Sequence, residues 1–323
     1  MLTSKYLNGE PEGSHATQGK SLLDGFLFDV SLGNIRKLND IAEGRGKTLA
    51  QMARVQARER EAMAREDDAK GRHRAVPSSR IGRLSGFGRL AGGVAGGMLG
   101  EGARTLADAD RYERIYADAI EAVGRTAKGQ GPEHGHGVSV KLSALSPRYE
   151  ATHEDEVWTS LYPRILHLAQ IAAKYDINFT MDAEEADRLA LSLKLLDRLA
   201  HEPSLGGWTG LGLAVQAYQK RGVPLCQWLI DLAEKHDRKF MIRLVKGAYW
   251  DTEIKISQVA GLGDFPVFTR KIATDVSYLA CAERLLAAGD LVYPAFATHN
   301  AYTVASIVSL AEREQRMGKF EFQ

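Results

Sequence analysis

The sequence predicts an α/β protein: an incomplete (β/α)8-type barrel with about six of the eight strands, preceded by a mostly helical N-terminal region. After about residue 100, short apolar runs alternate with stretches whose apolar residues recur at helical spacing. The short runs are apolar throughout, which is typical of strands buried on both faces of a parallel sheet. No dinucleotide-binding glycine fingerprint follows any of them, so a barrel is favoured over an open, doubly wound sheet.

Two segments precede the barrel. We expect residues 1–74 to be helical or partly disordered, because a helical pattern at 21–53 leads into a charged stretch at 54–74 with few apolar residues. Residues 75–137 are expected to form a glycine-rich segment, with eight glycines up to Gly100, and then a helical lead-in. These glycines are unlike a phosphate-binding loop, because no strand precedes them and no Lys-Ser or Lys-Thr pair follows.

The barrel is expected over residues 138–323, as strands that alternate with amphipathic helices. The expected strands are 138–145, 177–184, 210–218, 239–250, 292–300 and the last four residues, FEFQ. The expected helices are 157–175, 186–200, 223–236, 251–261, 273–289 and 302–314. Because the pattern stops two strands short of closure, we expect an open edge through which the chain could associate with itself.

Composition excludes several classes of protein. The formal net charge is +1 and 26% of residues are charged, so nothing favours nucleic acid as a partner. The two cysteines, Cys226 and Cys281, fit no metal or redox spacing, which indicates a reducing compartment. No apolar run approaches the ~20 residues of a membrane span, and no secretory signal is visible. We therefore expect a cytoplasmic location.

Ionisable side chains at the ends of buried strands mark a candidate site. Lys141, Asp182, Arg243 and His299 belong to four different expected strands, and each is an ionisable residue inside an otherwise apolar run. In a barrel, functional side chains gather at the C-terminal ends of the strands. A buried charge is costly unless it is paired or in use, so we expect these four residues to share one site.

The chemistry of this site is only partly determined by residue type. One histidine near scattered carboxylates is a weak pattern for a metal, so no metal is expected, and no nucleophile elbow is present. Lys141 could form a Schiff base, as in an aldolase-like barrel, and this alternative stays open. An anionic cofactor and substrate are favoured by the cations at the strand ends, which are Lys141, Arg243, Lys246, Arg270 and Lys271.

Seven motifs carry a resemblance to a known family. They are VSVKLSALSPRYE, MDAEEADRL, VQAYQKR, MIRLVKGAYWD, FTRKIATDVSYLACAERLL, FATHNAYTV and FEFQ. In this order, over about residues 100–323, they resemble the proline dehydrogenase domain of bifunctional proline utilisation flavoenzymes. The resemblance implies FAD as cofactor, oxidation of L-proline to 1-pyrroline-5-carboxylate, and transfer of the electrons to a quinone. It also implies a cytoplasmic protein that could be peripheral at the inner face of the membrane.

The resemblance also implies roles for individual residues. Arg243 would lie near the flavin, while Lys141 and Asp182 would form the substrate side, with Lys141 pairing with the proline carboxylate. We count these three residues as catalytic. The residues expected to bind the cofactor are Gln216, Arg243, Val245, Lys246, Gly247, Ala248, Trp250, Thr269, Lys271, Thr298, His299, Asn300 and Gln323.

Two departures from the family pattern lead to an alternative function. The family continues beyond FEFQ with two strands and a helix that carries a pair of arginines for the proline carboxylate, and this sequence ends at Gln323. Residues 1–53 resemble a C-terminal piece of aldo-keto reductases, and residues 75–104 resemble the N-terminal part of the ABC1/UbiB family. The alternative is therefore an inactive chimeric fragment that at most binds FAD.

Overall fold

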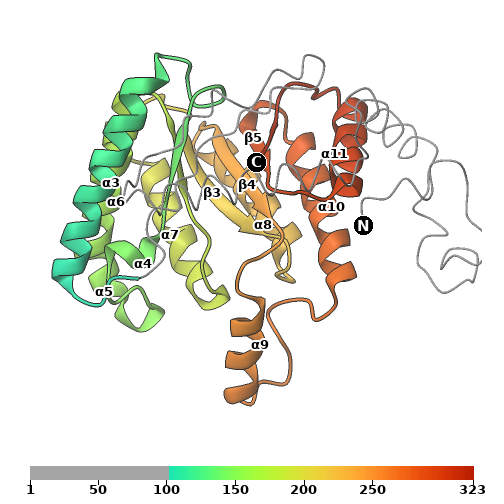
Figure 1. Ribbon diagram of the computed structural model, residues 1–323, viewed down its shortest axis with the longest axis horizontal. Helices are drawn as coiled ribbons and strands as arrows, with labels where there is room; N and C mark the ends of the chain where they lie inside the picture. Colours follow the sequence, from blue (N-terminus) through green and yellow to red (C-terminus); the bar gives the residue numbers. More distant parts are fainter. Residues whose placement is uncertain (1–101) are drawn as a thin grey trace, which may run out of the picture. The chain divides into compact units, whose positions relative to one another are not determined.

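The structure is a computed structural model, and it describes residues 102–323 (Figure 1). The predictions for residues 1–74 and for the glycine-rich part of 75–137 lie outside the described residues. Within the described part, residues Thr298–Gln315 group into one unit, and all other residues group into a second unit that holds the sheet. The sheet-bearing unit is therefore described on its own.

Six parallel strands form one sheet, in the order β1-β2-β3-β4-β5-β6. This confirms the predicted incomplete barrel, and each strand overlaps one of the six predicted runs, although the predicted strand 239–250 ends at Val245 because Trp250 already begins a helix. The strands are β1 (Gly137–Val140), β2 (Asn178–Met181), β3 (Leu211–Gln216), β4 (Phe240–Val245), β5 (Val292–Phe296) and β6 (Glu321–Phe322). Each strand pairs with the next one along the chain, which requires a crossover connection between every pair.

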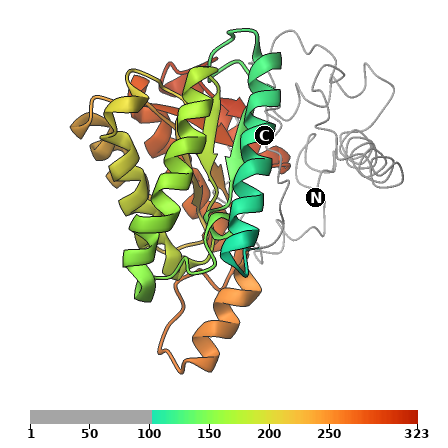
Figure 2. The same ribbon diagram turned by 90° about the vertical axis from the view of Figure 1, so that its left-hand side faces the viewer.

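Helices connect the strands. The helices are α3 (Leu106–Ala127), α4 (Leu142–Leu145), α5 (Glu154–Glu156), α6 (Tyr162–Lys174), α7 (Leu189–Ala200), α8 (Gly222–Lys235), α9 (Trp250–Val259), α10 (Lys271–Ala287) and α11 (Ala301–Arg313). Short turns of other helix types occur at Ala151–His153, Val157–Leu161, Ala186–Arg188, Pro203–Leu205 and Gly289–Leu291. The views in Figures 1 and 2 show α3 and α6 side by side on one face of the sheet.

Local sequence explains why α3 begins and packs where it does. Thr105 and Asp108 form a capping box, in which each side chain accepts a hydrogen bond from the backbone of the other residue. Near the other end, Gly124 lies against the ring of Tyr175, and an added Cβ would come within 2.2 Å of that ring. A glycine is therefore what allows α3 to approach the end of α6 so closely.

Strand β1 is shorter than the sequence predicts. The predicted run 138–145 is a strand only to Val140, and after Lys141, which is still extended, the short helix α4 begins at Leu142. The backbone N–H of Lys141 donates to the Tyr116 hydroxyl at 3.3 Å, and the N–H of Asp182 donates to the Val140 carbonyl at 2.9 Å. The helical turn still buries Leu142, which explains why the apolar pattern continued past the end of the strand.

Helix α9 and the loop after it extend away from the rest of the sheet-bearing unit (Figures 1 and 2). The buried side chains of α9 are Glu253 and Ser257, whereas Ile256, Val259 and the following Leu262 are exposed. Among residues 102–323, no helix is both long and apolar enough to cross a membrane.

Candidate active site

Arg243, on β4, is the centre of the candidate site. Its neighbours Ile242 and Leu244 are fully buried on the opposite face of the strand, because successive side chains of a strand alternate between faces. The Arg243 guanidinium donates from Nη1 to Ser139 Oγ at 2.5 Å and from Nε to Gln323 Oε1 at 2.6 Å. One side chain thus contacts both β1 and the residue that follows β6.

These two hydrogen bonds show how strongly the sheet curves. Neighbouring strands lie about 4.8 Å apart, so Ser139 on β1 would be roughly 14 Å from β4 in a flat sheet. The direct contact between Arg243 and Ser139 requires the sheet to curve until β1 and β4 face each other across its concave side. Arg243 therefore lies inside the barrel rather than on an outer face.

Two carboxyl groups lie near the Arg243 guanidinium. Asp182 Oδ1, just past the end of β2, is 3.8 Å from Nη1. Burial raises the pKa of Asp182, and the charges of Arg243 and Lys141 act against that shift. Burial also raises the pKa of Glu321, on β6, to about 7, opposed by a hydrogen bond from Gln323 and by the charge of Arg243. The site therefore holds a cation between two carboxyls that resist ionisation.

Three of the predicted residues come together here. Asp182, directly after β2, interacts electrostatically with Lys141, directly after β1, and with Arg243 on β4. Burial lowers the pKa of Arg243, while Asp182 and Glu321 counteract this effect. The arrangement can bind an anionic group near Lys141 and Arg243, and a cationic group near Asp182.

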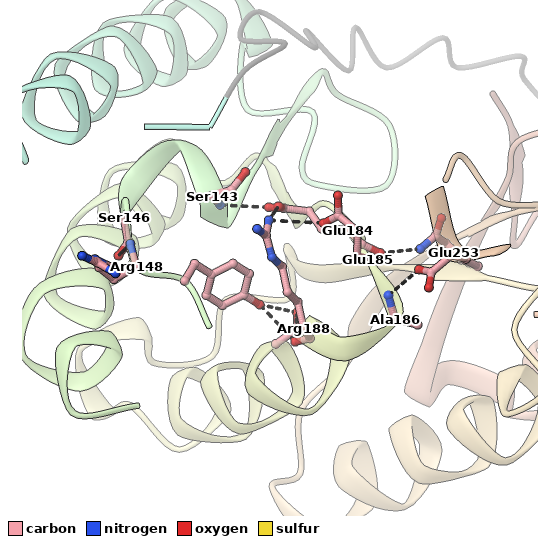
Figure 3. A network of polar contacts seen from close by, with 11 residues as sticks. Ser143, Ser146, Arg148, Glu184, Glu185, Ala186, Arg188 and Glu253 are labelled. Atoms are coloured by element: carbon pink, nitrogen blue, oxygen red, sulfur yellow. Dashed lines mark hydrogen bonds and ion pairs between the residues drawn. The ribbon is translucent and has the colours of Figure 1, made fainter. Parts of the chain in front are cut away.

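Gln216, at the end of β3, uses both ends of its amide inside the protein. Its Nε2 donates to the Glu184 carbonyl at 2.8 Å, and its Oε1 accepts from the Ala248 N–H at 3.1 Å. The Glu184 carboxylate in turn accepts from Ser143 N at 2.9 Å and from Arg188 Nη1 at 2.5 Å (Figure 3). Gln216 thus ties the loop after β2 to the loop after β4.

Two predicted cofactor-binding lysines share one carboxylate. Lys246, one residue after β4, and Lys271, at the start of α10, both form ion pairs with Asp275, the second at 2.6 Å. Burial acts to raise the pKa of the Asp275 carboxyl, but the hydrogen bonds from the two lysines outweigh burial, so the pKa is lowered. The Lys246 ammonium also lies 5.7 Å from the centre of the Tyr278 ring. Lys271 is 74% exposed, so its charge remains accessible to a ligand.

The backbone at Gly247 is bent in a way that only glycine tolerates well. Its φ is 147°, and an added Cβ would lie 2.3 Å from the ring of Tyr218. The N–H of Tyr218 donates to the Lys246 carbonyl at 2.7 Å, which holds the ring against this loop. Within the described part of the chain the buried Tyr218 hydroxyl has no hydrogen-bond partner, and burial raises the pKa of Tyr218.

The remaining predicted residues lie around this loop or in the other unit. Val245 ends β4 and pairs with Gln216, and Ala248 follows Gly247. Trp250 begins α9, is 43% exposed, and donates from its indole N–H to the Phe268 carbonyl at 2.9 Å; the exposed Thr269 follows Phe268. The other three residues, which follow β5 in the unit with α11, are Thr298, His299 and Asn300.

Asn300 has a local structural task. Its side-chain oxygen accepts from Thr303 N at 3.0 Å, which caps the N-terminus of α11. The strand-end asparagine was predicted from the resemblance as a cofactor residue, and an N-cap was not predicted. An asparagine three residues before a threonine at a helix start is a capping signal that the sequence already contained.

Sequence reasoning also missed several polar residues of the site. Ser139 and Glu321 line the barrel interior beside Arg243, and Glu253 is buried between two loops. Glu321 lies in the terminal FEFQ run, where the alternation between faces places it on the same side as Gln323. That alternation was the available signal for Glu321.

The fold and site together define a class: a parallel (β/α) barrel enzyme whose ionisable side chains cluster past the C-terminal ends of the strands. Residues 88–323 match the family model for proline dehydrogenase. The chain therefore belongs to the proline dehydrogenase family.

Relatives and solved structures agree with this assignment. The bifunctional protein PutA of Klebsiella aerogenes is 54% identical over 226 residues, which are 70% of this chain and 17% of the relative. The Rhizobium meliloti PutA is 50% identical over 224 residues, 68% of this chain and 18% of the relative. A mutant proline utilization A from Bradyrhizobium japonicum superposes with a TM-score of 0.67 at 54% identity, over 69% of this chain and 23% of that one. The chain thus spans less than a fifth of the length of these two curated relatives.

Proposed function

We propose that the chain carries out FAD-dependent oxidation of L-proline to 1-pyrroline-5-carboxylate. The observation that carries this proposal is the placement of Arg243 across the barrel interior, beside Asp182 and below the loop of Lys246, Gly247 and Ala248. The solved structure that superposes on the chain is of a proline utilization protein, whose name gives the same substrate. Membership of the proline dehydrogenase family supports the same activity for this chain.

The residues present fit a flavin dinucleotide. FAD carries two phosphates, and Lys246 and the exposed Lys271 place cations close together beside a shared carboxylate. The loop at Gly247 has no side chain because the Tyr218 ring occupies that place, and this packing holds the loop backbone next to Lys246. When bound, the flavin would supply the electron acceptance that no amino-acid side chain provides.

The chain's own residues would orient the substrate. Lys141 would attract the proline carboxylate, and Asp182 would hold the amino group, because the two side chains carry opposite charges and lie on neighbouring strands. Arg243 is fixed in place by Ser139 and Gln323, so its positive charge needs no rearrangement when negative charge develops beside it.

The electron acceptor and the location extend the same proposal. The resemblance supports a quinone as acceptor, and with it a cytoplasmic protein in peripheral contact with the inner face of the membrane. Quinone reduction by the proline-treated protein, with and without lipid vesicles, tests both points. If vesicles do not speed quinone reduction, the proposed peripheral contact with the membrane is wrong.

The test of the proposed function is an absorption spectrum of the purified chain before and after anaerobic addition of L-proline. Flavin bands that bleach with proline are expected, and a variant at an exposed position in the middle of α7, Lys194→Gln, should behave like the unmodified chain. Flavin bands that do not bleach would show that the chain binds the cofactor but does not oxidise proline. A colourless protein that takes up no added FAD would overturn the cofactor as well.

A further inference from the structure

Glu253 is a buried carboxylate outside the residues assigned so far. It lies in the first turn of α9, and only 4% of it is exposed. Burial raises the pKa of Glu253, as do the negative charges of Asp187 and Glu185, while the Ala186 N–H and Arg221 act in the opposite direction. A carboxylate in such surroundings is unfavourable unless its hydrogen bonds serve a purpose.

The Glu253 carboxylate holds one peptide group of the loop after β2. Its Oε1 accepts a hydrogen bond from Ala186 N at 2.6 Å, as the right-hand side of Figure 3 shows. The Ala186 carbonyl accepts from Arg221, which follows β3. The peptide groups on either side of Ala186 are therefore fixed from two directions, four residues after Asp182.

A second tie joins the same two loops. Gln216 bonds to the Glu184 carbonyl on the β2 side and to the Ala248 N–H on the β4 side. Glu253 repeats this connection further out, since it lies five residues after Ala248 and bonds to Ala186, two residues after Glu184. Two points of attachment fix both the distance and the orientation between the loops, which one point alone would not do.

We propose that Glu253 is a positioning residue, which holds the loop carrying Asp182 against the loop carrying Lys246 and Gly247. This inference rests on the proposed function. Asp182 and Arg243 interact at 3.8 Å, a distance at which a small loop shift changes the interaction markedly. Trp250 and Glu253 lie one turn apart on α9, so one helical turn carries both the indole that bonds to the Phe268 carbonyl and the carboxylate that bonds to Ala186.

The test compares Glu253→Ala and Glu253→Gln in the full chain, with Asp251→Ala as the matched control on the same helical turn. Asp251 is exposed, so its loss should leave the loops unchanged. Glu253→Ala should speed amide hydrogen exchange in residues 182–188 by about tenfold and raise the KM for proline by a similar factor, with a smaller change in kcat. Glu253→Gln should restore both, since its amide oxygen can accept the same hydrogen bond.

Two results would overturn the proposal. One is hydrogen exchange in residues 182–188 that is as slow in Glu253→Ala as in Asp251→Ala. The other is an equal rise in KM, with equal falls in kcat and in thermal stability, in both Glu253 variants, which would indicate a purely structural role. If the unmodified chain does not oxidise proline, the proposed function fails by itself, and the exchange rates still decide whether Glu253 holds this loop.

Discussion

The two ends of the barrel use charged residues in opposite ways. At the end where the strands begin, ionisable groups are neutralised locally: Lys239 pairs with Glu133 below the Tyr293 ring, and His236 lies 2.6 Å from Asp197. At the end where they finish, Arg243 is buried beside carboxyls that resist ionisation, and Lys271 remains accessible. Pairing at the first end contributes to stability, whereas incomplete compensation at the second leaves charge for a ligand.

A cavity formed by the described residues at the other end of the sheet illustrates the same contrast. It has a volume of about 610 Å³ and is lined by Trp158, Lys194, Asp197, Arg198, His201, Lys235 and His236. Helices α7 and α8 run back from the ends of β2 and β3, so their last residues lie at the beginning of the strands. A cavity of this size therefore lies away from Arg243, and the chemistry of the side chains, not the presence of a cavity, identifies the site.

The largest effect should come from Arg243. Arg243→Met removes the fixed cation while keeping an unbranched side chain, so kcat/KM for proline should fall by about 10²- to 10³-fold. Thermal stability should fall as well, because Ser139 and Gln323 lose their donor and the buried Asp182 and Glu321 lose their cationic neighbour. Arg243→Lys should fall in between, since an ammonium cannot reproduce the two directed contacts to Ser139 and Gln323. If Arg243→Met oxidised proline as fast as the unmodified chain, the charged residues at the two ends of the barrel would not differ in function.

Glu321 should make stability depend on pH. Its pKa is raised from 4.5 in the unfolded chain to about 7, so the folded protein holds a proton that the unfolded chain releases. The stabilisation is complete below pH 4.5 and is lost as the pH rises through 7, by about 3 kcal/mol in total. In Glu321→Gln, the urea concentration at the midpoint of unfolding should depend less on pH between 5 and 8. A curve with the same slope in both proteins would contradict this.

Gly247→Ala should strain the loop at the mouth of the barrel. The new Cβ would meet the Tyr218 ring, and the φ of 147° is unfavourable for alanine, so we expect a loss of about 2 kcal/mol. Gly263→Ala is the control, because its Cβ would meet no heavy atom within 4 Å. Thermal unfolding of the two variants measures the difference, and equal melting temperatures would show that the loop relaxes freely.

The smallest effect should come from Lys239. Lys239→Met leaves Glu133 partly buried without its partner, which should lower the free energy of unfolding by about 1–2 kcal/mol. Flavin bands and proline oxidation should stay unchanged, because the pair lies at the opposite end from Arg243. The exposed Lys235→Met, which also removes an ion pair, should change stability by less than about 0.5 kcal/mol. A loss of flavin binding in Lys239→Met would break the comparison.

The sequence predicted the sheet and its centre because both follow from burial patterns. Apolar runs gave all six strands, and a charge inside such a run singled out Arg243, which the structure places inside the barrel. Hydrogen-bond partners were not predictable in the same way. A strand-end glutamine such as Gln216 reads equally well as a ligand-binding or a structural residue, since its type does not show where its amide bonds.

The position of β1's end was not predictable for a related reason. Val140 is followed by Leu142, Ala144 and Leu145, which are all buried, so hydrophobicity does not mark the change from strand to helix. The change depends on long-range contacts, such as the one from the Tyr116 hydroxyl to the Lys141 backbone. Glu253 was equally hidden, because a carboxylate in the first turn of a helix normally reads as a solvent-exposed charge that interacts with the helix dipole.

The two hydrogen bonds that Arg243 donates, to Ser139 and to Gln323, have a consequence for the order in which the chain folds. Its hydrogen-bond partners lie 104 residues before it and 80 residues after it, so both loops must close before either bond gains its full value. Helices and neighbouring strand pairs can form earlier, from contacts closer in sequence. We therefore expect Arg243 to acquire its native environment only in the last step of folding, so that a refolding chain becomes competent to bind ligand together with, and not before, its final increase in stability.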